Sequence, residues 1–156
     1  SPDDIPLLFR TSRRVDRAEL RGFLGELTRR VLHGRTISCL IADDAAIRRL
    51  NRQYRGKNQA TDVLSFSPAS PNGIAGDIAI SIDRARMQAA QYGHSLTDEV
   101  RILMLHGALH LAGMDHEADS GEMARAESRW RKRLGLPDGL LERSRGERSA
   151  DKKAKP

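Results

Sequence analysis

Residues Leu105–Glu117 read LHGALHLAGMDHE and hold three of the five histidines in this 156-residue chain. His106 and His110 are four residues apart, so both imidazoles project from the same face of an α-helix. Gly113 follows, and glycine ends helices readily because it adopts the left-handed conformation without steric cost. The chain can then turn back and bring His116 toward the first two histidines. Three neutral imidazoles leave one position of a tetrahedral ion open for water, which is typical of catalytic zinc sites.

A histidine pair at this spacing also occurs on ordinary helices that bind no metal. Two features favour a metal site here. The helix is expected to be buried because its neighbouring residues are apolar, namely Ile102, Leu103, Leu105, Leu109 and Leu111. Unpaired imidazoles are costly inside a core, and a third histidine follows beyond the glycine. The sequence therefore predicts a metal site formed by His106, His110 and His116.

The spacing His-x3-His-x2-Gly-x2-His also resembles the zinc-binding run of the metzincin proteases. In that run the residue after the first histidine is a glutamate, which acts as the general base for the zinc-bound water. Here the same position is Gly107. A peptidase would therefore lack its catalytic base, so we expect a similar zinc scaffold with different chemistry.

The length and charge of the chain fit one basic domain. Its 27 Lys and Arg residues outnumber 21 Asp and Glu residues, for a formal net charge of +6. Residues 142–156 contribute +3 of this excess, with six basic and three acidic side chains, which leaves +3 for the rest. A basic balance suits a polyanionic partner, although many basic proteins bind none.

Cys39 is the sole cysteine, so no disulfide can form within the chain. A single buried thiol is consistent with a reducing cytosol. No apolar run approaches the roughly 18 residues of a membrane span, and no charged-then-apolar leader opens the sequence. We therefore expect a soluble, cytoplasmic protein.

The remaining sequence predicts short strands that alternate with amphipathic helices. Strands are expected at residues 5–9, 36–42, 63–66 and 76–82. Helices are expected at residues 17–32, 43–54, 83–92, 97–111 and 120–134, with Asp16, Asp43 or Asp44, Asp83, and Ser95 or Thr97 at their starts. Asp98 and Glu99 fall in a first helical turn, where the helix dipole favours acids. Pro137 and Gly139 are expected to close a domain spanning residues 1–140, followed by a basic, disordered tail at 141–156.

Three cations surround one polar loop between the helix at 43–54 and the strand at 63–66. They are Arg52, Arg55 and Lys57. Each of them could simply be a solvated surface residue. Arginine, however, can hold phosphate oxygens with two parallel hydrogen bonds, which lysine cannot do. Arg55 is therefore a candidate for phosphate binding.

Four motifs, in this order, resemble the YbeY family of bacterial endoribonucleases. They are Asn51-x2-Tyr-Arg, Ala60-Thr-Asp-Val-Leu-Ser-Phe, Gly76-Asp-Ile-x-Ile and His106-Gly-x-Leu-His-Leu-x-Gly-x-Asp-His. The resemblance covers Val15–Leu136. It implies a single α+β domain with a small four-stranded mixed sheet, about five helices and a zincin-like metal helix. It also implies single-strand-specific, zinc-dependent cleavage of RNA in 16S ribosomal RNA 3′ end maturation and ribosome quality control, with ribosomal RNA, the small subunit and its associated proteins as partners.

The same resemblance suggests roles for individual residues. His106, His110 and His116 match the ligands of one zinc ion, and Arg55 matches an arginine of the RNA cleft. Arg52 and Lys57 are not part of this match; as cations of the same loop they are further candidate substrate contacts. Asp115 matches the family pattern, either as a proton acceptor or as a carboxylate that orients a histidine. The chain departs from the usual pattern at Asn58, Ser67 and Met114.

The chemistry leaves three classes of function open. A zinc ion can stabilise phosphoryl oxygens and lower the pKa of its bound water to about 7, which suits an endoribonuclease. Without a carboxylate at Gly107, the nucleophile is either zinc hydroxide, water activated by another base, or a ribose 2′-OH. The alternatives are a peptidase or amidase, and a ribosome assembly or binding factor with a structural zinc. Other divalent metals also bind imidazoles.

Overall fold

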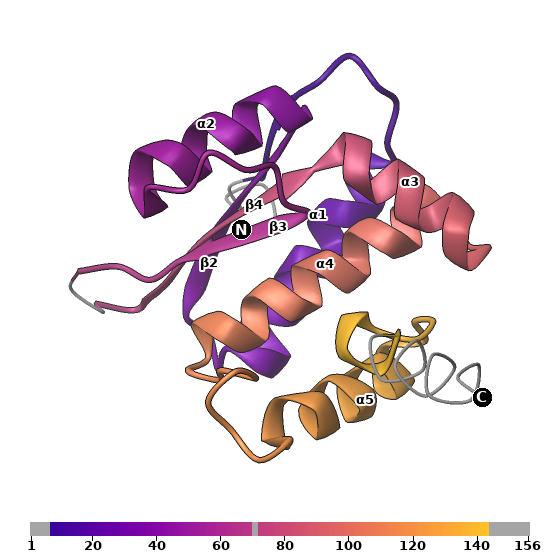
Figure 1. Ribbon diagram of the computed structural model, residues 1–156. Coiled ribbons are helices and arrows are strands. Elements are labelled where there is room, and N and C mark those ends of the chain that lie inside the picture. Colours follow the sequence, from indigo (N-terminus) through magenta and orange to yellow (C-terminus); the bar gives the residue numbers. More distant parts are fainter. Residues whose placement is uncertain (1–6, 70–71, 144–156) are drawn as a thin grey trace, which may run out of the picture.

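The computed structural model describes residues 7–69 and 72–143 (Figure 1). The strands of this part are β1 (Leu7–Arg10), β2 (Thr36–Ala42), β3 (Val63–Phe66) and β4 (Ile74–Ser81). Its helices are α1 (Arg17–Glu26), the π-helical turn η2 (Leu27–Val31), α2 (Asp44–Arg55), α3 (Ile82–Tyr92), α4 (Leu96–Leu111) and α5 (Glu122–Leu134). None of the described helices is both long and apolar enough to span a bilayer.

The strands form one mixed sheet in the order β1-β2-β4-β3. β1, β2 and β4 are parallel, whereas β3 runs antiparallel to β4 and leaves its outer edge unpaired by any described strand. Gly76 makes the close pairing of β4 with β3 possible. Its φ of +143° suits glycine, and a Cβ there would collide with the backbone oxygen of Phe66. The α+β fold with a small four-stranded mixed sheet is confirmed.

Helices cover both faces of this sheet (Figure 1). The main core joins α1, α3, α4 and α5 to one face, where Ile37, Ile41, Ile78 and Ile80 are at most 1% exposed. A smaller core lies under α2 on the other face, with its buried residues Ala42, Ile47, Leu64 and Ala79. Strands that are buried on both faces read as continuous apolar runs, and this accounts for the sequence of β2.

The predicted elements are largely confirmed. The predicted strands at 36–42 and 63–66 match β2 and β3, and the side chain of Asp16 accepts a hydrogen bond from Glu19 N at 3.1 Å as the cap of α1. The predicted strand at 5–9 matches β1 only in part, since residues 5 and 6 lie outside the described residues.

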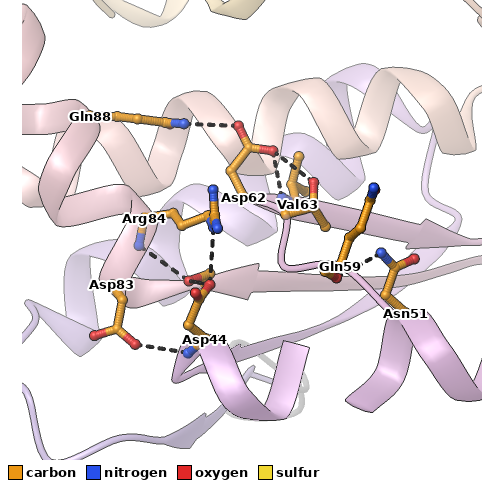
Figure 2. A network of polar contacts seen from close by, with 10 residues as sticks. Asp44, Asn51, Gln59, Asp62, Val63, Asp83, Arg84 and Gln88 are labelled. Atoms are coloured by element: carbon orange, nitrogen blue, oxygen red, sulfur yellow. Dashed lines mark hydrogen bonds and ion pairs between the residues drawn. The ribbon is translucent and has the colours of Figure 1, made fainter. Parts of the chain in front are cut away.

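The predicted cap of α3 is wrong. Ser81, at the end of β4, accepts the hydrogen bond of Arg84 N at 3.2 Å, so Asp83 falls inside the first turn. Asp83 instead accepts the backbone N–H of Asp44 at 2.8 Å, and it thereby serves the start of α2 (Figure 2). Asp43, one of the two predicted caps, does occupy the N-cap position of α2, but its side chain makes no capping hydrogen bond. The Asp44 carboxylate accepts from Ser81 and Arg84 instead.

The folded part also extends past Gly139. Residues 140–143 form a helical turn, and Arg143 is buried with its guanidinium 3.0 Å from the carboxylate of Glu99. Glu99 was expected only to interact with the dipole at the start of its helix. In the structure it is fully buried, and its carboxylate also lies 2.6 Å from His94 Nε2. A charge inside a core needs such partners. The rest of the predicted tail, residues 144–156, lies outside the described residues.

Candidate metal centre

The three histidines singled out by the sequence meet at the C-terminal end of α4. His106 and His110 lie on the helix, and a turn at Gly113, whose φ is +97°, leads the chain back toward them. His116 follows on this loop. One ring nitrogen of each histidine lies within 4.8 Å of the others, so the group could hold one metal ion.

Two of the rings are held by hydrogen bonds through Nδ1. His106 Nδ1 lies 3.0 Å from Oε2 of Glu127, and His110 Nδ1 lies 3.0 Å from the backbone oxygen of Met114. A carbonyl oxygen can only accept, so His110 carries its proton on Nδ1 and keeps the lone pair of Nε2 free. Histidines that bind metals are oriented in this way. The donor set therefore fits a divalent metal such as zinc.

The surroundings of His110 favour its neutral imidazole. Partial burial lowers the pKa of His110 below its ordinary value, and the neighbouring His106 and His116 lower it further. A metal ligand must donate a lone pair, so the neutral form is the competent one.

The histidines line a cleft of about 560 Å³ beside the edge strand β3. Arg55 lines the same cleft: its guanidinium donates to the backbone oxygen of Ser65 and lies 5.2 Å from the centre of the Phe66 ring. Arg52 and Lys57 are exposed and are not among the residues that line the cleft. Of the three predicted cations, the structure brings only Arg55 to the histidines.

Two aspartates also line the cleft. The carboxylate of Asp115 accepts the backbone N–H of Glu117 at 3.0 Å, and the hydrogen bonds of the described residues include none between Asp115 and a histidine. Asp62 is half-buried and fixed by Val63 N at 2.8 Å and by Gln88 Nε2 at 3.2 Å (Figure 2). Both carboxylates can accept a proton inside the cleft.

Glu127 is a site residue that the sequence analysis missed. It is 1% exposed, and its two carboxylate oxygens reach different partners, His106 and the backbone N–H of Leu141 at 2.9 Å. A signal was present in the sequence. Glu127 interrupts the apolar face of α5 next to Ala126 and one turn after Met123, both of which are buried. An acid on a buried face calls for a buried partner.

Gly107 packs α4 against the sheet. Its carbonyl accepts the hydroxyl of Ser65 at 3.3 Å, and a Cβ at this position would lie 3.1 Å from the side chain of Ile78. At the position that carries the glutamate base in the metzincin run, a Cβ would therefore approach the Ile78 side chain more closely than ordinary van der Waals contact. A glutamate could not be accommodated here without displacing Ile78.

The sequence and the fold are both similar to those of known proteins. Residues 12–135 match a family profile described as Endoribonuclease YbeY. An Endoribonuclease YbeY of Solibacter usitatus is 49% identical over 144 residues, which is 92% of this chain and 97% of that protein. One of Koribacter versatilis is 55% identical over 108 residues, 69% of this chain and 70% of that protein. The solution structure of TM1509 from Thermotoga maritima superimposes with a TM-score of 0.58 at 24% identity, covering 80% of this chain and 85% of that one.

Proposed function

Because the chain belongs to the endoribonuclease YbeY family, we propose that it is a zinc-dependent endoribonuclease that cleaves single-stranded RNA at the histidine cleft. We further propose that its substrate is the 3′ end region of 16S ribosomal RNA and that it acts in ribosome quality control. Its proposed location is the cytoplasm, and its proposed partners are the small ribosomal subunit and the proteins associated with it. The observation that carries the proposal is the shared cleft, in which Arg55 lies with three imidazoles whose ring nitrogens are close enough to hold one metal ion.

The proposed ligands are His106, His110 and His116, each through the ring nitrogen that faces the other two. When bound, a zinc ion supplies positive charge to phosphoryl oxygens and acidifies water. Glu127 and the carbonyl of Met114 hold two of the rings in the tautomer that such a site needs. Their distances of 3.0 Å are those of normal hydrogen bonds.

Arg55 is proposed to bind the phosphate that is cleaved. Its Nη2 donates to Ser65 O, and the remaining N–H groups of the guanidinium are available to phosphate oxygens. The hydrogen bond to Ser65 and the contact with the Phe66 ring hold the guanidinium against β3. Arg52 and Lys57, which lie outside the cleft lining, would attract the RNA without touching the reacting atoms.

Proton transfer is proposed to involve a carboxylate of the cleft. Asp115 is exposed and lies on the same loop as His116, immediately before it, so it can reach a nucleophile from the solvent side. Asp62 faces the same space from the start of β3. An Asp→Asn change at each position, with the pH profile of cleavage recorded, would identify the acceptor, because only its loss removes the acidic limb of the profile.

A direct test is the cleavage of a labelled single-stranded RNA that ends in the 16S 3′ region. Metal-loaded protein, chelated protein and the His106→Ala variant are compared, with casein as a parallel substrate. We expect cleavage of RNA by the metal-loaded protein alone, with casein intact. Digestion of casein would indicate a peptidase. Intact RNA with zinc bound would support an assembly factor, and cleavage of ribosome-bound RNA should then be tested before that conclusion is drawn.

A further inference from the structure

The sheet face that carries α2 is only partly covered. Beyond the small core, a groove of about 340 Å³ stays open between α2, β1 and the end of β3. Its floor comes from β2 and β4, where Ser38 and Asp77 are paired across the strands. Its walls are mainly apolar and include Leu50 and Tyr54 from α2. The groove is separated from the histidine cleft by the edge strand β3.

Tyr54 is the most unusual residue of this groove. Its exposed fraction is 63%, in a chain whose aromatic content is only 4%. The Tyr54 ring contacts the Phe66 ring edge-to-face, with 5.7 Å between centroids. Phe66 in turn lies under the guanidinium of Arg55, which lines the histidine cleft. A chain of contacts therefore leads from the histidine cleft through Arg55 and Phe66 to the exposed ring of Tyr54.

The charged residues near the groove are one acid and a set of cations. The acid is Asp77, an exposed residue of the groove lining whose carboxylate accepts the hydroxyl of Ser38. Exposed cations lie along α2 and just after it, namely Arg48, Arg49, Arg52, Arg55 and Lys57. Apart from Arg55, which bonds Ser65 O, these side chains form no ion pair within the part of the chain that the structure describes. None of these cations lines the groove, but Arg55 lies over Phe66, which does, so a phosphate held by Arg55 would lie beside the groove. Inside the groove, the Asp77 carboxylate suits a flat, uncharged group with N–H donors.

We propose that this groove is a subsite for one unpaired nucleobase of single-stranded RNA, stacked on Tyr54, next to the nucleotide held at Arg55. The proposal rests on the proposed function and names how the substrate is gripped. Base stacking on an aromatic ring tolerates any base. The Asp77 carboxylate can accept an exocyclic amino group, so adenine, cytosine and guanine are favoured over uracil.

The test measures RNA binding separately from cleavage. A short, unstructured, dye-labelled RNA is titrated with the full-length chain in a chelator buffer, and anisotropy is recorded for wild type, Tyr54→Ala and Tyr54→Phe. Met87→Ala is the matched control, since Met87 is 68% exposed but lies on α3, outside the groove. We expect Tyr54→Ala to weaken binding about 10-fold, as for the loss of one stacked base. Tyr54→Phe and Met87→Ala should bind like wild type.

A set of RNAs with a single abasic nucleotide then locates the base. In wild type, one abasic position should weaken binding by the same factor as Tyr54→Ala, and in Tyr54→Ala that position should have no further effect. Additive losses would overturn the proposal. So would a Tyr54→Ala variant that binds RNA normally but melts at a lower temperature, because the groove would then be a packing surface for the chain itself.

The outcomes also separate this inference from the proposed function. Cleavage by metal-loaded Tyr54→Ala should show a raised KM with kcat little changed, since stacking remote from the phosphate acts in both ground and transition states. Wild-type protein that cleaves RNA, with unchanged KM and affinity in Tyr54→Ala, would refute the subsite alone. Wild-type protein that neither binds nor cleaves RNA would refute both.

Discussion

The carboxylate of Glu127 should control how tightly the histidines hold metal. It contacts Nδ1 of His106 through one oxygen and the backbone N–H of Leu141 through the other, at 3.0 and 2.9 Å, and it is 1% exposed. In Glu127→Gln the volume is kept and the amide oxygen can still accept from Leu141. The amide nitrogen then faces Nδ1 of His106, so a donor meets a donor and the ring loses its support.

The size of the effect follows from these contacts. Removing the hydrogen-bond partner of a metal-binding histidine weakens metal affinity by about 10- to 100-fold, or about 1.4 to 2.7 kcal/mol. Glu127→Gln is expected to fall in this range while it keeps the fold. Glu127→Ala also leaves two buried donors without partners, at about 1–3 kcal/mol each, so its free energy of unfolding should fall by about 2–6 kcal/mol.

The assay is competition for zinc with a chromophoric chelator, combined with urea unfolding of the metal-free chain. Glu26→Gln is the control, because Glu26 bonds Arg30 on the exposed surface of α1 and should change neither quantity. Gly139→Ala is an independent probe, since a Cβ at Gly139 would collide with the Glu127 carboxylate. Wild-type zinc affinity in Glu127→Gln would refute the reasoning.

Four further outcomes are expected. His110→Ala should abolish stoichiometric zinc, measured by metal analysis of the purified protein, and full occupancy would exclude it as a ligand. Arg55→Ala should keep metal and fold but lower kcat for RNA cleavage by about 100-fold or more, with no recovery in Arg55→Lys; an unchanged rate would remove it from the active site. Gly76→Ala should lower the free energy of unfolding by about 3 kcal/mol. Its control is Gly73→Ala, which also lies at positive φ but has open space around it and should cost about 1 kcal/mol. Equal losses would show that the collision of the added Cβ with the Phe66 backbone is not the cause. Burial raises the pKa of Cys39 to about 12 from 9.0. Between these two values the thiol of the folded protein stays neutral, while the thiol of the unfolded chain ionises. The stability that Cys39 contributes is therefore complete below pH 9.0 and should be lost as the pH rises toward 12. Urea titrations across this range should show a smaller decline in Cys39→Ala.

Features set by neighbours in the chain were predictable from the sequence. The spacing of His106 and His110 on one helix face, the glycine stop and the return to His116 are local, and the structure assembles them as expected. The cap at Asp16 and the apolar run of β2 are local in the same sense. The fold class followed from these patterns together with the family motifs.

Features that depend on how elements pack were not predictable in this way. Glu127 meets His106 from a helix 21 residues further along the chain, and no periodicity within α5 reveals that partner. Asp83 reads as a cap for its own helix, yet in the fold it serves α2. Arg143 was assigned to a disordered tail, but its pairing with the buried Glu99 is possible only once α4 and the C-terminal turn are in contact.

The compactness of the candidate ligand set has a thermodynamic consequence. All three histidines lie within residues 106–116, so even an unfolded chain needs to close only a short loop to surround an ion. A ligand that also binds the unfolded state stabilises the fold by less than its affinity for the native state would give. If zinc binds at the three histidines as proposed, it should therefore raise the melting temperature only modestly, and thermal-shift screening would underestimate the affinity of the folded protein for zinc.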